Sequence, residues 1–202
     1  FDGRGESIII GGSSLSKEFH QLIALINYNL KAPVDYYPLN MSQISSIKNF
    51  ESLCNDMKNG KINNLIILGA NPAYDSPVDF DFAESLKKVK NSVHLTSIID
   101  ETSKLCSWNI AMNHYFECWG DAMTYDGHVS IVQPQIMPLF DSKSIIQVLS
   151  PIVYSKEQSA YDTVKNVWKS NIIKSGNFER EWDKVLHDGL YKKPIFKKVN
   201  VR

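Results

Sequence analysis

The feature that most constrains the fold is a short apolar run that ends abruptly at a glycine. Residues 64–68 read Asn-Leu-Ile-Ile-Leu, and residues 69–72 follow directly as Gly-Ala-Asn-Pro. An apolar run without polar alternation is typical of a central parallel strand that is buried on both faces. Glycine and proline then stop the strand. We therefore expect residues 64–68 to lie at the centre of a parallel sheet.

Strand and helix patterns alternate through the first two thirds of the chain. Strands are predicted near residues 7–10, 34–37, 64–68 and 92–97. Apolar residues recur at helical spacing within residues 16–30, 47–57, 82–89 and 100–106. Alternating strands and helices with short connections predict an α/β fold, a doubly wound and mostly parallel sheet with helices on both faces.

The alternation ends after Trp108. Residues 109–140 are predicted to be irregular apart from a strand at 129–132, and helices are predicted from Ser142 onward, around 161–168 and around 182–186. We therefore divide the chain into an α/β domain at 1–150, C-terminal helices packed on it at 151–191, and a linker tail at 192–202. The start at Phe1, without a methionine, leads us to expect a piece of a longer protein.

Composition excludes several classes of protein. The chain of 202 residues holds 22 Lys and Arg against 22 Asp and Glu, which argues against a nucleic-acid partner. No apolar run approaches the roughly 18 residues of a membrane span, so we expect no direct membrane insertion. Cys54, Cys106 and Cys118 form no C-x-x-C pair and are expected to be structural. The histidines are too scattered for a zinc triad, so we predict no metal site.

Two turns could hold a ligand. Ligands of open α/β sheets bind outside the carboxyl ends of the strands, and there Gly69 would permit close approach while Asn71 would offer its amide. The alternative is a plain Gly-Asn-Pro turn. Gly11 and Gly12 could hold a phosphate before the next helix, but the motif lacks a full dinucleotide or P-loop pattern, which favours a plain turn here too.

The irregular segment is dense in functional residue types. Glu117 and Asp121 could act as a general acid and base, but nothing places a nucleophile beside them, so we predict no catalytic residue. We instead expect Glu117 and Trp119 to be buried anchors, with Glu117 accepting backbone hydrogen bonds and both Trp119 and Tyr125 packing inward.

Several short motifs follow one another in a characteristic order. They are residues 65–72, 92–95, 100–103, then 114–121 (His-Tyr-Phe-Glu-Cys-Trp-Gly-Asp) and 125–134 (Tyr-Asp-Gly-His-Val-Ser-Ile-Val-Gln-Pro). Together they resemble one domain of the molybdopterin oxidoreductases. The most similar branch is the molybdopterin-oxidoreductase-like half of the iron–sulfur subunit of bacterial alternative complex III, a quinol:cytochrome c oxidoreductase. The resemblance runs from about residue 7 to residue 189.

The resemblance implies where a cofactor would bind. Family members that hold a cofactor use this domain to bind one molybdopterin guanine dinucleotide. Gly69, Asn71 and Pro72 would then line the dinucleotide. The acidic pair Asp100 and Glu101 would meet the guanine or ribose edge.

A second set of positions matches the family's Glu…Gly-Thr…Gly…Gln pattern. Glu117, Gly120, Gly127 and Gln133 occupy those positions, but Asp121 stands where the family has Thr. An added carboxylate facing a diphosphate would repel it. The resemblance therefore favours the branch that keeps the fold without molybdenum, and we expect no cofactor in this chain.

The implied function is a cofactor-free scaffold and interaction domain of a respiratory quinol-oxidising complex. The expected partners are further domains of the same protein, including an iron–sulfur domain, and other subunits of a membrane complex. The expected location is the periplasmic face of the bacterial inner membrane. Two alternatives stay open: the dinucleotide-binding domain of a molybdenum or tungsten bis-pterin oxidoreductase, and an unrelated nucleotide-dependent enzyme that uses the Gly11 or Gly69 turn.

Overall fold

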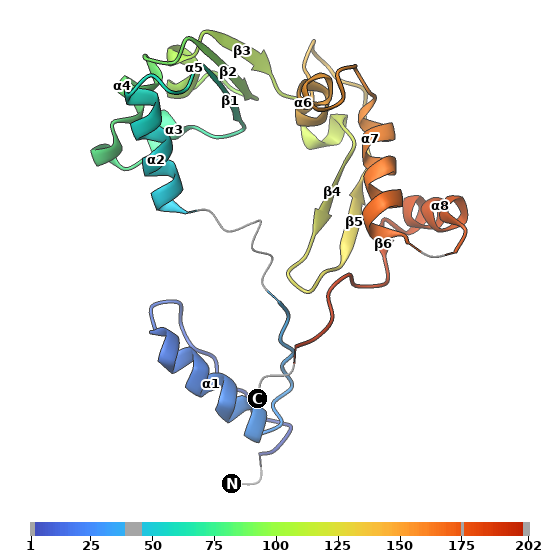
Figure 1. Cartoon of the computed structure of the whole chain (residues 1–202). Helices are drawn as coiled ribbons and strands as arrows, with labels where there is room; N and C mark the ends of the chain where they lie inside the picture. Colours follow the sequence, from blue (N-terminus) through green and yellow to red (C-terminus); the bar gives the residue numbers. More distant parts are fainter. Residues whose placement is uncertain (1–2, 39–45, 175, 200–202) are drawn as a thin grey trace. The chain divides into compact units, whose positions relative to one another are not determined.

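The computed structural model describes residues 3–38, 46–174 and 176–199, which form two compact units. The first unit takes its described residues from 1–41, 123–129 and 192–202, and the second takes them from 42–122 and 130–191. Figure 1 labels the helices and strands. These units bear on the predicted domain boundaries at 150 and 191 only in part, so those boundaries stay a prediction.

The first unit contains helix α1 (Lys17–Asn29), which begins after Ser16 as predicted. The predicted strands at 7–10 and 34–37 were wrong, because both segments are extended but join no sheet among the described residues. A side chain supplies hydrogen bonds that a neighbouring strand would otherwise have made. The buried amide of Asn27 accepts from Ile9 N at 2.9 Å and donates to Ile9 O at 2.8 Å. The β-branched run therefore satisfies part of its backbone on α1 rather than on another strand.

The second unit confirms the mixed α/β class. Its first sheet has the parallel order β1-β2-β3, and Figure 1 shows the three strands flanked by helices. The strands are β1 (Asn64–Leu68), β2 (Asn91–Thr96) and β3 (Trp108–Ala111). Leu68 pairs with Leu95, and Thr96 pairs with Ala111. The carboxyl ends of the three strands therefore lie along one edge of the sheet.

The central position of residues 64–68 was a wrong prediction. β1 lies at an edge of the described sheet, and Ile66 is 37% exposed. β2 is central instead, with Leu95 and His94 fully buried. The segments 7–10 and 34–37, which were predicted as strands, join no sheet among the described residues, while β3, which was not predicted, pairs with β2.

Helices pack on this sheet through an apolar core. The helices are α2 (Ile47–Lys58), α3 (Pro72–Asp75), η2 (Val78–Phe80), α4 (Phe82–Leu86) and α5 (Glu101–Leu105). The core joins α2, β1 and α4, with Cys54, Met57 and Leu86 buried. Phe50 stacks on Phe82 with ring centroids 5.6 Å apart. As predicted for a structural residue, Cys54 behaves as a small hydrophobe, and the three cysteines are free thiols.

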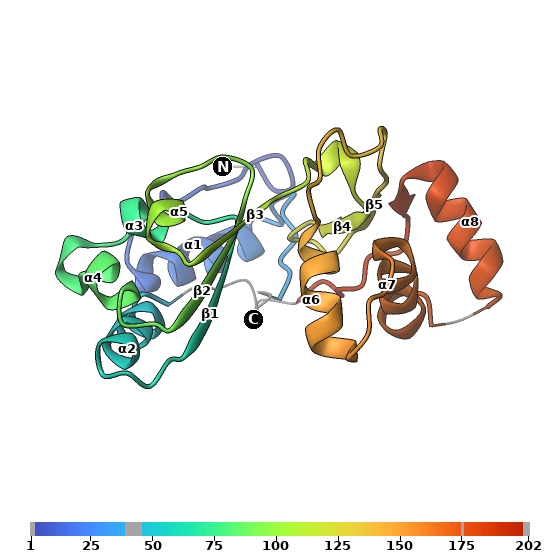
Figure 2. The ribbon, with the colours of Figure 1, turned by 90° about the horizontal axis from the view of Figure 1, so that it is seen from above.

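A second sheet, of order β4-β5-β6, follows with three C-terminal helices. Figure 2 shows β4 and β5 side by side. The elements are η3 (Tyr115–Glu117), β4 (Gly120–Met123), β5 (Val129–Val132), α6 (Ile145–Tyr154), α7 (Ala160–Val167), η4 (Trp168–Ile172), α8 (Phe178–Asp188) and β6 (Leu190–Tyr191). The strand at 129–132 and the helices are confirmed, except that Ser144 rather than Ser142 caps α6. No helix in the described part of the chain is long and apolar enough to span a bilayer.

Candidate functional site

The turn between β1 and α3 is the strongest site candidate, and its backbone is built by Gly69 and Pro72. Gly69 has a φ of +62°, a conformation that strains any residue with a Cβ, and its N–H donates to Leu95 O at 2.8 Å. Pro72 occupies the first turn of α3, where a missing N–H costs least. The turn therefore leaves the sheet at the carboxyl end of β1, as predicted.

The Asn71 amide bonds to α5 at both ends. Its Nδ2 donates to Glu101 Oε2 at 2.7 Å, and its Oδ1 accepts from Thr102 Oγ1 at 2.7 Å and from Thr102 N at 3.2 Å. Thr102 is fully buried, and its hydroxyl also accepts from Ala73 N at 3.0 Å. We call Asn71, Glu101 and Thr102 the turn clamp. It ties two segments that lie about thirty residues apart in the sequence.

The acidic residues beside the turn serve α5. The Asp100 carboxylate caps this helix by accepting from Ser103 N at 2.8 Å and from Ser103 Oγ at 2.9 Å. Desolvation by burial acts to raise the pKa of Asp100, but the bonds from Ser103 and the nearby His94 outweigh it, so the pKa lies below its usual value. The bond from Asn71 likewise lowers the pKa of Glu101. Both groups are therefore fixed carboxylates.

His94 bonds to the backbone of the turn. Its Nε2 lies 2.9 Å from Ala70 O, and its Nδ1 lies 3.0 Å from Ser103 Oγ. A carbonyl oxygen only accepts, so Nε2 carries a proton and donates to the turn. His94 is fully buried and both of its ring nitrogens bond to protein groups, so we assign it a structural role.

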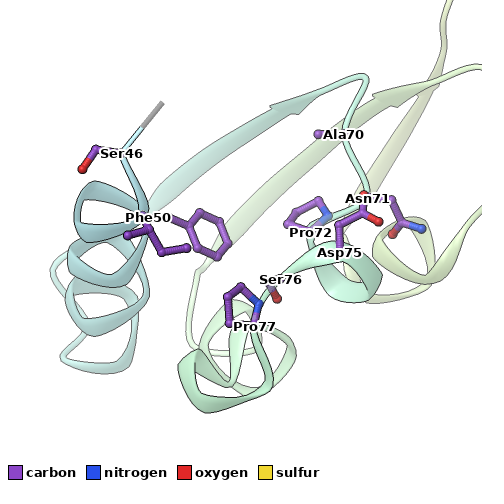
Figure 3. Close-up of a pocket in the computed structure, with 9 residues that line it drawn as sticks. Ser46, Phe50, Ala70, Asn71, Pro72, Asp75, Ser76 and Pro77 are labelled. Atoms are coloured by element: carbon purple, nitrogen blue, oxygen red, sulfur yellow. The ribbon is translucent and has the colours of Figure 1, made fainter. Parts of the chain in front are cut away.

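A cavity of about 590 Å³ opens beside this turn, between α2 and α3. Figure 3 shows the ring of Phe50 facing Pro72 and Pro77 across it, with the Asn71 amide on the other side of Pro72. The described lining residues are Ser46, Ile47, Phe50, Ala70, Asn71, Pro72, Asp75, Ser76 and Pro77. They include one carboxylate, from Asp75, and neither Lys nor Arg. The described lining is largely apolar and offers no positive charge to a diphosphate.

The candidate residues beyond Trp108 lie apart from the turn clamp. Glu117 accepts from His114 N at 2.8 Å and from Leu139 N at 3.0 Å, and the bond from Leu139, followed by that from His114, lowers its pKa. The predicted backbone bonds of Glu117 are thus confirmed, but its predicted burial was wrong, because the residue is only half-buried on the short η3 segment. Gln133 donates its amide to Leu186 O at 2.8 Å.

The two aromatic residues of this segment behave differently. Trp119 is half-buried and packs edge-on against Tyr161, with ring centroids 4.9 Å apart. The prediction for Tyr125 was wrong, because it is 92% exposed. It lies in the tight β4–β5 turn, where Thr124 N donates to His128 O. A two-strand turn of this length has no interior in which to place a tyrosine ring.

Of the two glycines in the family pattern, Gly127 has a local steric reason and Gly120 has none. Gly127 has a φ of +86°, and a Cβ there would lie 2.7 Å from Phe196 N. Gly120 begins β4, where a Cβ would meet Val132 at an ordinary 3.8 Å. At the Gly11 turn a Cβ would lie 2.6 Å from the Ile23 side chain, so close packing of α1 explains that glycine.

The structure thus brings Gly69, Asn71, Pro72, Asp100 and Glu101 together, and it places Glu117, Gly120 and Gln133 elsewhere. Sequence analysis missed Thr102 and His94, whose partners are distant in the chain. Within the described residues no three His, Cys, Asp or Glu side chains gather as metal ligands would.

Comparisons with known proteins assign no family. No family model and no curated protein match the chain. Among solved structures, acetylene hydratase from Pelobacter acetylenicus is similar over 48% of this chain, with 15% identity and a TM-score of 0.43. The chain spans 15% of that protein's length. Similarity at this level carries no argument about activity, and nothing in it points to alternative complex III.

Proposed function

We propose that this chain is a scaffold and interaction domain of a larger oxidoreductase assembly, in which the nucleotide-type turn serves structure instead of a cofactor. The observation that carries the proposal is how the turn uses its donors. Ala73 N–H donates to Thr102, while Tyr74 N–H and Asp75 N–H donate to Asn71 O. Pro72 has no N–H. A phosphate at the start of α3 would need free N–H groups of that helix, and these three are already bonded.

The charges around the turn support the same proposal. Asp75, Asp100 and Glu101 put three carboxylates on the turn and on the helix that it contacts. A dinucleotide brings a diphosphate, which these groups repel more strongly as water is excluded. The residues present therefore do not fit a pterin guanine dinucleotide in this arrangement.

The resemblance noted in the sequence refines the proposal. It suggests a quinol-oxidising complex related to alternative complex III, with iron–sulfur clusters in another domain and the assembly on the periplasmic face of the membrane. Its partners would be that domain and neighbouring subunits. The Asn71 side chain bonds within the domain at both ends, so we expect contacts with partners to use other faces.

Elemental analysis and calorimetry test the proposal. We expect the purified protein, expressed together with any further domains of its gene, to contain no stoichiometric molybdenum or tungsten. We also expect no heat of binding when guanosine diphosphate is titrated into it at millimolar concentration. Stoichiometric metal, or nucleotide binding that Asn71→Ala abolishes, would overturn the scaffold function.

The second candidate is the dinucleotide-binding domain of a molybdenum or tungsten enzyme. The 590 Å³ cavity favours it, because it lies at the carboxyl end of β1, where ligands of α/β sheets bind. Binding there would require Asn71 to leave Glu101 and Thr102. Asp75→Asn provides a matched probe: on this candidate, removing the charge strengthens nucleotide binding, whereas a scaffold binds no nucleotide in either form.

A further inference from the structure

A second cavity, of about 470 Å³, lies beyond the carboxyl ends of β2 and β3 and contains none of the turn clamp. We call it the Trp119 pocket. Its described lining residues are Ser97, Met112, Asn113, His114, Tyr115, Cys118, Trp119, Gly120, Asp121, Ser144, Ile145 and Ile146. A volume of this size suits a small organic ligand.

The wall of this pocket is aromatic and apolar. Rings come from His114, Tyr115 and Trp119, and aliphatic groups come from Met112 and two isoleucines. The rings of His114 and Tyr115 are in tilted contact, with centroids 4.1 Å apart, which fixes two of the rings. Aromatic faces attract cations, and tryptophan attracts them most strongly.

The polar groups of the wall are mainly acceptors. Asp121 Oδ2 accepts from Trp168 Nε1 at 2.8 Å, and this bond orients the carboxylate. Its Oδ1 makes no hydrogen bond to the described residues. Asn113 is 6% exposed, and its Oδ1 is buried without a hydrogen-bond partner among the described residues. An unpaired buried acceptor costs roughly 1–3 kcal/mol, so a ligand donor that reached it would recover this energy.

Positive charge is scarce in the wall. None of the described lining residues is Lys or Arg. The basic side chain among them is His114, whose Nδ1 accepts from Phe116 N at 3.3 Å. Desolvation, followed by the charge of Glu117, raises the pKa of the Cys118 thiol, so this residue stays a neutral thiol. The described wall therefore combines one carboxylate with aromatic rings and has no Lys or Arg to neutralise that carboxylate.

We propose that the Trp119 pocket binds a small organic ammonium ion, with the cation at Asp121 and its apolar skeleton among Trp119, Met112 and the isoleucines. The ammonium hydrogens meet Asp121 Oδ1. Anions are excluded by the same carboxylate. This inference rests on the pocket alone and not on the scaffold function.

Three ligands of matched size and different charge test it. Phenethylammonium, 2-phenylethanol and 3-phenylpropionate would be titrated into the full chain and followed by calorimetry and by NMR chemical-shift changes. We expect the ammonium ion to bind most tightly, the alcohol more weakly and the carboxylate not at all. Asp121→Asn should weaken ammonium binding about tenfold or more while changing alcohol binding little. Asparagine keeps the acceptor for Trp168, so the fold is preserved.

Asp141→Asn is the matched control, since Asp141 is exposed and lies outside the pocket. It should leave binding of the ammonium ion unchanged. Three results would each overturn the proposal: no binding of phenethylammonium at millimolar concentration, equal binding of 3-phenylpropionate, or equal weakening by both substitutions. None of them bears on the metal content or on the nucleotide titration.

Discussion

The β1–α3 turn and the Trp119 pocket both follow strand ends of the parallel sheet, but they use their polar groups in opposite ways. At the turn, Asn71, Thr102 and Asp100 bond to one another's segments and leave little for a ligand. In the pocket, Asn113 Oδ1 is unpaired and Asp121 bonds through a single oxygen. A family-like motif is therefore a poorer guide to a binding site than the state of its hydrogen bonds.

The largest expected effect comes from breaking the turn at His94. His94→Ala removes a fully buried ring and leaves Ala70 O without its donor, which should cost about 3 kcal/mol of unfolding free energy. Urea unfolding followed by circular dichroism measures this. His187→Ala is the control, since that side chain is 87% exposed, and it should change stability by about 0.5 kcal/mol or less. Equal midpoints for both variants would refute the structural role of His94.

The next effect tests the turn clamp without creating a cavity. Thr102→Val keeps the shape of the side chain but removes the hydroxyl, so Ala73 N–H loses its acceptor and Asn71 Oδ1 loses a donor. We expect a loss of about 2 kcal/mol. Thr102→Ser retains the hydroxyl and should cost less than half as much. Equal unfolding free energies for the two variants would show that the hydroxyl does not contribute to stability.

Glu117 lies next to the Trp119 pocket, but its carboxylate bonds within the protein, as the polar groups of the β1–α3 turn do. It therefore tests whether a residue beside the pocket is structural. Glu117→Ala removes the acceptor of His114 N and Leu139 N and should lower the melting temperature. Glu117→Gln retains one acceptor oxygen, so its melting temperature should lie between those of the wild type and Glu117→Ala. A melting temperature that stays at the wild-type value in both variants would favour a ligand-binding role for Glu117.

The smallest effect is a dependence on pH. Bonds from Thr124, followed by those from His128, lower the pKa of Asp126 to about 2. The folded pKa lies below the unfolded one, so the stabilisation is complete above about pH 4 and is lost as the pH falls through about 2. NMR titration of Asp126 measures the shift, and Thr124→Val should move the pKa upward. A titration midpoint near 3.8 in the wild type would refute these bonds.

The local parts of the fold could be predicted from sequence, whereas the long-range ones could not. Apolar spacing and capping residues located β1, β2, α5 and the strand at 129–132, since these patterns act over a few residues. The run at 7–10 has the same β-branched composition but bonds to Asn27, eighteen residues away. Composition does not reveal which partner a backbone finds.

The same reason explains what was missed at the candidate site. Asn71 was recognised as a polar residue at a strand end, but its engagement by Thr102 depends on a contact across 31 residues. The sequence did not single out Asn113 either, because whether its side-chain oxygen has a hydrogen-bond partner depends on which residues the fold brings near it. Residues 114–121 are rich in functional residue types, and residues of this segment line the Trp119 pocket together with Ser144 and the start of α6.

Trp168 and Trp182 give one half of the second unit an optical signature of its own. Both indoles are almost fully buried, and their ring centroids are 5.6 Å apart at an angle of 72°. Indoles this close couple their electronic transitions, which adds a paired band to the far-ultraviolet dichroism. Trp108 on β3 is 68% exposed and open to collisional quenchers such as acrylamide. One denaturation can therefore report separately on the parallel sheet and on the tryptophan-rich helices, without any added label.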